Sequence, residues 1–466
     1  MKEVSRRKFI ATSGVAAVGM FLAHPVLSEI IREKGKLRVT LVGTGVRGIT
    51  FWGKKLQDNY SEILEFVGLC DTNPGRLSFA KQYIGVDCKT YLDFEDMLKE
   101  SKPDLVMVTT VDAFHHQYII KGLKSGINVF SEKPMTTDEE KCQAILDAER
   151  ESGKSLIIGF NYRYNPHYTK LKDLLHNARV GKITSVDFHW YLNVYHGASY
   201  FRRWHGYREF GGTLWVHKAT HHFDLLNWWL DSDPVEVTAY AELEHYGKNG
   251  EFRGDNCRSC NYKSDCKFYW DITKDKFAMD LYADNEKYDG YIRDNCVFSE
   301  DIDIYDKMSA QIKYANGVLV NYSLTTYSPY EGMRIAFNGM NGRIDAWDGI
   351  PWSKDTKLSQ AELHDQEMSQ SDEEKDFEEI YVMDNFGGYE QIKVLKESGG
   401  HGGGDKRLQD KIFANPQAPD PLKHSAGSRD GAMSVLIGIA ARKSVETGKP
   451  VKIADLTDLE SRPNRV

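Results

Sequence analysis

The sequence lacks an excess of positive charge. Its 466 residues include 60 Lys and Arg against 68 Asp and Glu, so the formal net charge is -8. A protein that binds nucleic acid or an anionic membrane surface usually presents a basic patch on a net basic domain. The charge balance therefore argues against both kinds of partner.

Long apolar runs are also missing. The longest lies between Phe9 and Ala23, and at about 15 residues it is shorter than the ~20 needed to span a bilayer. We therefore expect no stable membrane span. The charged Ser5-Arg6-Arg7-Lys8 before this run resembles the twin-arginine export signal of bacteria. A signal peptide at residues 1–28 predicts a periplasmic or cell-envelope protein that is exported in the folded state.

Cysteine is scarce, with 7 residues in the whole chain. Four of them lie in a polar stretch at residues 245–300, which we interpret as an insert. The spacing can close a tetrahedral zinc site, and in an exported protein two disulfides are the alternative. Folding before export favours metal loading over oxidation. We therefore expect a structural zinc ion bound by Cys257, Cys260, Cys266 and Cys296.

The order of predicted elements is that of an α/β protein. Short apolar runs at residues 37–42, 63–70, 104–109 and 128–130 alternate with helical stretches, which is typical of βαβ units and a parallel sheet. After about Phe160 the residues alternate between apolar and polar, which predicts antiparallel strands. These patterns place one domain at 36–159 and a second at 160–450. The acidic run at 372–379 is interpreted as a solvated loop within a stretch at about 355–400 that looks inserted.

A glycine motif follows the first predicted strand. Gly43-x-Gly45-x-x-Gly48 opens a helix, and Asp71 ends the second strand, which is the context of the dinucleotide fingerprint. The glycines permit a tight turn, close approach of a pyrophosphate and close packing of helix on strand. A carboxylate at Asp71 binds ribose hydroxyls and repels a 2′-phosphate. The sequence therefore predicts a Rossmann domain that prefers NAD to NADP, although Arg47 and Arg76 lie nearby.

Three further motifs resemble the Gfo/Idh/MocA family of oxidoreductases over about residues 36–345. They are Thr110-Val-Asp112-Ala-Phe-His115, Glu132-Lys133-Pro134 and Asn161-Tyr-Arg163-Tyr-Asn-Pro166. The usual family run is Thr-Pro-Asn-x-x-His, followed by Glu-Lys-Pro. The resemblance implies a Rossmann domain followed by an α/β domain with a large open sheet that walls the active site. It also implies tightly held NAD and a small carbohydrate substrate, and we expect a homo-oligomer.

The resemblance assigns the catalytic roles. Lys133 would reach the substrate oxygen and the nicotinamide, and we expect a cis bond before Pro134. His221 matches the proton-carrying His of the family pattern Asp-x-Gly-x-His-x-x-Asp, but His217 replaces the first Asp, so Lys218 is a reserve. The candidate residues are Lys133, His221 and Lys218 for catalysis; Gly43, Gly45, Val46, Arg47, Gly48, Asp71, Thr110, His115, Glu132 and Lys133 for the cofactor; and Arg163, Tyr164, His217 and Trp204 for the substrate.

Three functions are compatible with these residues. The expected one is an NAD-dependent oxidoreductase that acts on a hydroxyl of a sugar, sugar derivative or cyclitol. The first alternative is an NAD-dependent glycoside hydrolase, which oxidises a hydroxyl transiently, eliminates the aglycone and then reduces the product. The second alternative is a non-catalytic sugar-binding protein, and Lys133 and His221 argue against it.

Overall fold

The computed structural model describes residue 33 and residues 35–349, 377–397 and 400–465. The predicted signal peptide at residues 1–28 lies outside these ranges and stays a prediction. Within them, no helix combines the length and the apolar character that a membrane crossing requires.

The first part of the chain is built on a six-stranded parallel sheet with the order β3-β2-β1-β4-β5-β6. All four residues of β4 are buried, as expected for strands with both faces covered. The order reverses between β1 and β4, and open α/β sheets bind ligands at the carboxyl ends of strands at such a point. The elements are β1 Leu37–Val42, η1 Arg47–Lys54, α3 Lys55–Tyr60, β2 Leu64–Cys70, α4 Pro74–Ile84, β3 Thr90–Tyr91, α5 Phe94–Ser101, β4 Leu105–Val108, η2 Asp112–Phe114, α6 His115–Lys124, β5 Asn128–Ser131, α7 Glu139–Ser152 and β6 Leu156–Ile158.

The second part is built on a nine-stranded sheet with the order β14-β13-β12-β11-β7-β10-β9-β8-β15. Its strands pair antiparallel except for β7 with β10. Exposed and buried residues alternate along β9, so one face of the sheet meets solvent there. The predicted α/β fold, with a parallel sheet followed by a large and mostly antiparallel one, is confirmed. The strands are β7 Ile183–Asn193, β8 Pro234–Glu242, β9 Lys307–Tyr314, β10 Leu319–Ser328, β11 Gly332–Gly339, β12 Gly342–Asp348, β13 Phe377–Asp384, β14 Tyr389–Leu395 and β15 Val451–Lys452.

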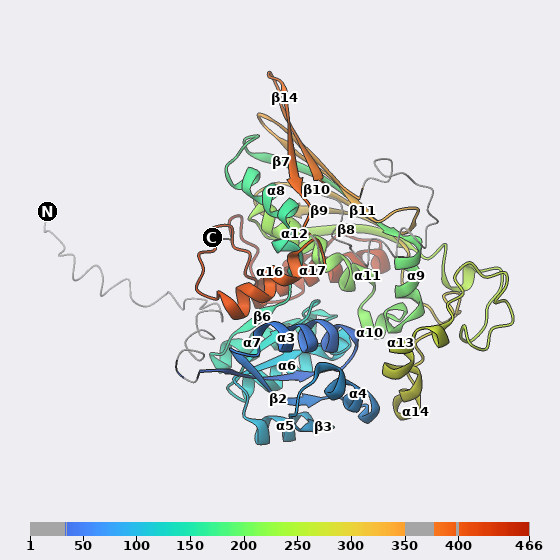
Figure 1. Cartoon of the computed structure of the whole chain (residues 1–466). Coiled ribbons are helices and arrows are strands. Elements are labelled where there is room, and N and C mark those ends of the chain that lie inside the picture. The colour runs from blue at the N-terminus through green and yellow to red at the C-terminus, as the bar shows by residue number, and fades with distance from the viewer. Residues whose placement is uncertain (1–32, 34, 350–376, 398–399, 466) are drawn as a thin grey trace, which may run out of the picture.

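Helices cover one face of this sheet. Every residue of α12 (Ala219–Leu230) is buried, and so are most residues of α17 (Ser428–Thr447), because these helices lie inside the molecule. Figure 1 shows α11, α16 and α17 between the two sheets. The other helices are η3 Asn161–Tyr164, α8 Pro166–His176, α9 Val194–Arg202, η4 Trp204–Gly206, α10 Arg208–Gly211, α11 Leu214–His217, η5 Gly247–Asn249, η6 Ile272–Lys274, α13 Lys276–Leu281, η7 Ala283–Asn285, α14 Glu286–Asp289, α16 Gly404–Gln409, η9 Asp410–Ala414 and η10 Ile453–Asp455.

One prediction for the second part is wrong. The end of the acidic run is not a loop, because residues 377–395 form the β13–β14 hairpin that extends the sheet beside β12. Ile380 and Val382 are fully buried in this hairpin. The run Ile380-Tyr-Val-Met383 inside β13 is a strand signal, which the acidic residues before it obscure.

The chain returns to the first domain after β14. The Gln409 side chain donates a hydrogen bond to the Phe51 carbonyl oxygen, 2.9 Å away. Leu408, Ile412 and Phe413 pack in the same apolar core as β1 and β2. This return connects the two parts next to the carboxyl end of the parallel sheet.

Candidate active site

The glycine loop connects β1 to η1 and packs against the end of β4. Gly43 has a φ of +91°, and a Cβ there would lie 2.6 Å from the backbone of Thr109. A Cβ on Gly48 would lie 2.4 Å from the Gly43 carbonyl oxygen. Both glycines are therefore required by the tight turn and by close packing, as the fingerprint predicts.

Gly45 is different, because a Cβ there would meet nothing in the described ranges within 4 Å except the Tyr282 hydroxyl at 3.5 Å. Packing within the first domain therefore does not explain this glycine, whereas the approach of a pyrophosphate does. The helix η1 begins two residues later, so its positive end faces the same space. The loop fits the dinucleotide that the fingerprint predicts.

Asp71 lies at the end of β2 and holds the loop. Its Oδ2 accepts hydrogen bonds from the backbone N–H and the hydroxyl of Thr44, at 2.7 and 2.9 Å. Its Oδ1 accepts from Arg76 at 3.1 Å, and Arg76 also forms an ion pair of 2.6 Å with Asp289. Two carboxylates thus occupy the arginine that could otherwise bind a 2′-phosphate.

Asp289 belongs to the insert, which covers this end of the site. The hydroxyl of Tyr282 accepts the backbone N–H of Val46 at 2.9 Å, and the carbonyl oxygen of Asn285 accepts from the Asn73 side chain at 3.0 Å. Figure 1 places α13 and α14 beside α4. No local sequence pattern predicts these contacts, because they join residues more than 200 positions apart.

Other residues predicted to bind the cofactor also hold the scaffold. The Arg47 guanidinium pairs with Glu132 at 2.7 Å and with Asp405 at 3.0 Å. Both ring nitrogens of His115 lie at backbone carbonyl oxygens, those of Pro134 at 2.8 Å and Thr110 at 3.0 Å. These contacts fix the turns after β4 and β5 relative to the glycine loop.

Lys133 follows β5, and the Lys133–Pro134 peptide bond is cis, as predicted. The Nζ of Lys133 donates to the His217 carbonyl oxygen at 3.4 Å. Burial lowers the pKa of Lys133 to about 8, although the carboxylates of Glu132 and Asp112 oppose this shift. An ammonium with such a pKa can give up its proton near neutral pH.

His217 lies in α11 and pairs with Asp112 from the other domain. Its Nδ1 is 2.6 Å from Oδ2 of Asp112, and both side chains are buried. Burial raises the pKa of Asp112 and lowers that of His217, while the ammonium of Lys133 favours the carboxylate form of Asp112. When Asp112 is a carboxylate, Nδ1–H of His217 donates to it, which leaves Nε2 as the basic atom of the imidazole.

Asp112 was not predicted as a site residue, although the sequence held a signal for it. His217 stands where the family pattern has Asp, and Asp112 stands where the Thr-Pro-Asn run has Asn. The two departures are complementary, because together they restore a carboxylate–imidazole pair with its partners on different elements. Trp204 and His205 surround the pair, with His205 4.2 Å and Trp204 5.5 Å from the His217 ring.

His221 and Lys218 meet at Tyr162. The His221 ring stacks on the Tyr162 ring at 4.1 Å, and the Lys218 Nζ donates to the Tyr162 hydroxyl at 3.1 Å. Burial and the charges of Lys133 and Lys218 hold the pKa of His221 well below its ordinary value. His221 is therefore a neutral imidazole close to Lys133 and Lys218.

The comparisons with known proteins agree with this geometry. Residues 37–160 match the NAD-binding Rossmann fold, and residues 172–453 the C-terminal α/β domain, of the Gfo/Idh/MocA oxidoreductase family. The chain belongs to this family. YteT of Bacillus subtilis (strain 168) is 35% identical over 443 residues, covering 91% of this chain and 99% of that protein.

Two further relatives are more distant than YteT. Inositol 2-dehydrogenase of Salmonella typhimurium (strain LT2) is 27% identical over 205 residues, covering 44% of this chain and 57% of that enzyme. Among solved structures, the WlbA dehydrogenase from Bordetella pertussis, in complex with NADH and UDP-GlcNAcA, aligns with a TM-score of 0.59 at 18% identity. That alignment covers 90% of this chain and 97% of WlbA, and at this identity it shows the shared fold.

Arg163 and Tyr164, which were predicted to bind the substrate, have their contacts with other residues of the fold. The buried Arg163 guanidinium binds both oxygens of Asp224, at 2.5 and 2.8 Å, and Asp430 at 2.8 Å. Its Nη1 donates to backbone carbonyl oxygens, so no donor remains for a ligand. Tyr164 is buried beside Arg163, with its ring 5.3 Å from the ring of His424. The structure gives both residues a role in the fold.

The insert does not support the zinc prediction. All seven cysteines are free thiols, and the described ranges contain no group of three or more His, Cys, Asp or Glu side chains placed to hold a metal ion. The Arg202 guanidinium donates a hydrogen bond to the Cys257 sulfur at 2.8 Å, so this sulfur already has a positively charged partner. The spacing of the four cysteines is compatible with zinc, but the described residues give the predicted site no further support.

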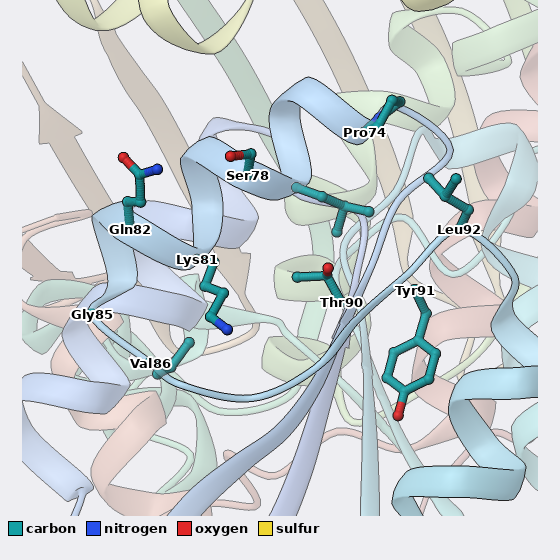
Figure 2. Close-up of a pocket in the computed structure, with 10 residues that line it drawn as sticks. Pro74, Ser78, Lys81, Gln82, Gly85, Val86, Thr90, Tyr91 and Leu92 are labelled. Carbon is teal, nitrogen blue, oxygen red and sulfur yellow. The ribbon is translucent and has the colours of Figure 1, made fainter.

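A hollow of about 710 Å³ lies between α4 and the segment that ends at Leu92 (Figure 2). None of the residues predicted for the cofactor, the substrate or catalysis lines it. Its one cation, Lys81, already pairs with Asp87 at 3.1 Å. This hollow is a surface feature outside the site.

The arrangement around Arg76 predicts the cofactor preference. We expect the wild-type protein to bind NADH more tightly than NADPH, because Asp71 and Asp289 repel a 2′-phosphate and occupy Arg76. Replacing both (Asp71→Ser with Asp289→Ser) should free Arg76 and shift the affinity ratio toward NADPH by about 10- to 100-fold, the value of one or two charged hydrogen bonds. Fluorescence titration with both dinucleotides measures the ratio. Asp280→Ser is the control, since the Asp280 carboxylate pairs with the exposed Lys276 and with no other cation among the described residues. Tighter NADPH binding by the wild type would refute the assignment.

Proposed function

We propose that this protein is an NAD-dependent oxidoreductase that acts on a hydroxyl group of a sugar, sugar derivative or cyclitol. The observation that carries the proposal is the Asp112–His217 pair at 2.6 Å, with Lys133 3.4 Å from the His217 carbonyl oxygen. A base and an ammonium thus lie at the carboxyl end of the parallel sheet, where the cofactor binds. The inositol dehydrogenases among its relatives act on the same class of hydroxyl.

Each side chain has a defined task in this proposal. Lys133 holds the substrate oxygen and stabilises its negative charge as the proton leaves. His217 accepts that proton at Nε2, and Asp112 stabilises the imidazolium that forms. Neutral His221, fixed on Tyr162, offers a further hydrogen bond to the substrate. NAD, when bound, supplies the hydride acceptor.

The proton relay, by which we mean the Asp112–His217 pair, predicts the effects of substitution. His217→Ala and Asp112→Asn should each lower kcat by about 10²- to 10⁴-fold, the usual contribution of a positioned acid–base group. Affinity for NADH should change little, because neither residue belongs to the glycine loop. His176→Ala at the exposed end of α8 is the matched control. Steady-state kinetics with dinucleotide titration check this, and near wild-type turnover by both variants would mean that the proton carrier is another residue.

Lys133 predicts a pH dependence of the oxidation. Its amine is protonated below about pH 8 and neutral above it. Since the ammonium stabilises the developing alkoxide, kcat/KM for oxidation should fall as the pH rises through about 8. The Lys133→Arg variant should stay charged over this pH range, so its kcat/KM should not fall through pH 8, whatever its absolute rate. Equal slopes for wild type and Lys133→Arg between pH 7 and pH 9.5 would show that Lys133 does not titrate in the rate.

The function itself is tested with matched glycosides and free polyols, with and without added NAD. The dehydrogenase proposed here should reduce NAD stoichiometrically with a free sugar or cyclitol and stop when NAD is exhausted. Repeated aglycone release without added NAD would replace it with the redox-type hydrolase. Sugar binding without any NADH signal would favour the non-catalytic sugar-binding protein. Protein with Lys133→Ala serves as the blank in each arm.

A further inference from the structure

Two arginines at the site have no carboxylate partner. Arg203 lies between α9 and η4, and its Nε donates to the Ser199 carbonyl oxygen at 2.7 Å. Arg293 follows α14 in the insert, and its Nη1 donates to the Tyr291 hydroxyl at 3.4 Å. Within the described ranges, neither guanidinium forms an ion pair, whereas Arg47, Arg76 and Arg163 each bind two acids.

Aromatic rings hold both guanidinium groups in place. Arg203 lies over Tyr200 with its Cζ 5.4 Å from the ring centroid, and Arg293 lies over Tyr282 at 4.8 Å. Such cation–π contacts orient a guanidinium but leave its N–H donors available. The two guanidinium groups also repel each other, because burial and the charge of Arg293 lower the pKa of Arg203 to about 10.

Arg203 is at the catalytic end of the site. The Tyr200 ring beneath it is 5.3 Å from the His217 ring. The charge of Arg203 contributes to the lowered pKa of both His205 and His217. Arg293 lies on Tyr282, whose hydroxyl contacts the glycine loop at Val46. The pair therefore extends from the proton relay toward the cofactor.

Positive charge exceeds negative charge around these residues. Lys133 and Lys218 add two cations. The nearby acids have other partners: Glu132 binds Arg47, Asp112 binds His217, Glu331 binds His196, and Asp275, whose charge acts on Arg293, accepts the backbone N–H of Ala278. Partly buried cations without counter-charges destabilise a fold unless a ligand compensates them. An anion placed between Arg203 and Arg293 would supply this compensation.

We propose that Arg203 and Arg293 bind an anionic group of the substrate, a carboxylate or a phosphate ester. The proposal rests on the proposed function and specifies its substrate class as an acidic sugar or cyclitol derivative. Planar guanidinium groups match both anions by paired hydrogen bonds. The cofactor pyrophosphate is the weaker candidate, because Gly45 and the start of η1 already form its site and Arg203 lies at His217 instead.

The test compares matched triplets of a neutral hexose, its hexuronate and its 6-phosphate, in the galactose and glucose series, on the full-length NAD-loaded protein. Calorimetry measures binding, and initial rates measure turnover. One acid in the panel should bind and turn over at least about 10-fold better than its neutral counterpart. Arg203→Gln and Arg293→Gln should each reduce that preference by about 10- to 100-fold, while NADH affinity stays within about twofold.

Arg334→Gln is the control, since Arg334 is exposed on β11 and lies over Trp347. Equal or better binding of the neutral sugars, or no binding of any acid, would overturn the inference. A parallel loss of NADH affinity in both arginine variants would assign the pair to the pyrophosphate instead. If the acids bind through the two arginines but no compound reduces NAD, the anion site stands and the proposed redox function fails.

Discussion

The hydrogen bond between Asp112 and His217 is the contact on which the active site depends. Asp112 comes from the turn after β4 and His217 from the short helix α11, so this bond joins the two domains at the candidate active site. A buried hydrogen bond to a charged group contributes about 1.5–3 kcal/mol. The geometry of this bond matters more. In the proposed function His217 is the base, and Asp112 sets its orientation and tautomer only when both domains are in place.

The surrounding structure holds this contact. Arg47 connects the glycine loop to Glu132 beside Lys133 and to Asp405 in α16. His115 connects the turns after β4 and β5. These residues were predicted to touch the cofactor, but their polar atoms are used within the protein. They fix the positions of Lys133 and Asp112, and a site whose groups are fixed in advance loses little free energy to rearrangement during the reaction.

The sequence predicted what depends on local spacing and missed what depends on long-range contacts. The fold class, the glycine turn and the Lys133–Pro134 cis bond follow from short motifs with known geometry. Arg163 and Tyr164 lie in a motif as well, but the partner of Arg163 is Asp224, on another helix, and no local pattern shows that this pair is buried. The cysteine spacing was compatible with zinc because spacing does not show that Arg202 reaches Cys257. The β13 strand was hidden because the acidic run that ends at Glu379 overlaps its first residues.

The insert is the part that the family resemblance explains least, and three of its residues contact the site. Asp289 pairs with Arg76, the Asn285 carbonyl oxygen accepts from Asn73, and the Tyr282 hydroxyl accepts from Val46 of the glycine loop. Within the insert, Arg293 lies over Tyr282. Phe277 packs against Phe79 and Tyr83 of α4, so the segment is anchored by apolar contacts as well as by charge. One short stretch of chain therefore faces both the cofactor and the space beside the proton relay. A change in its packing would alter cofactor preference and the charge at the substrate position together, which distinguishes this site from one built on the two sheets alone.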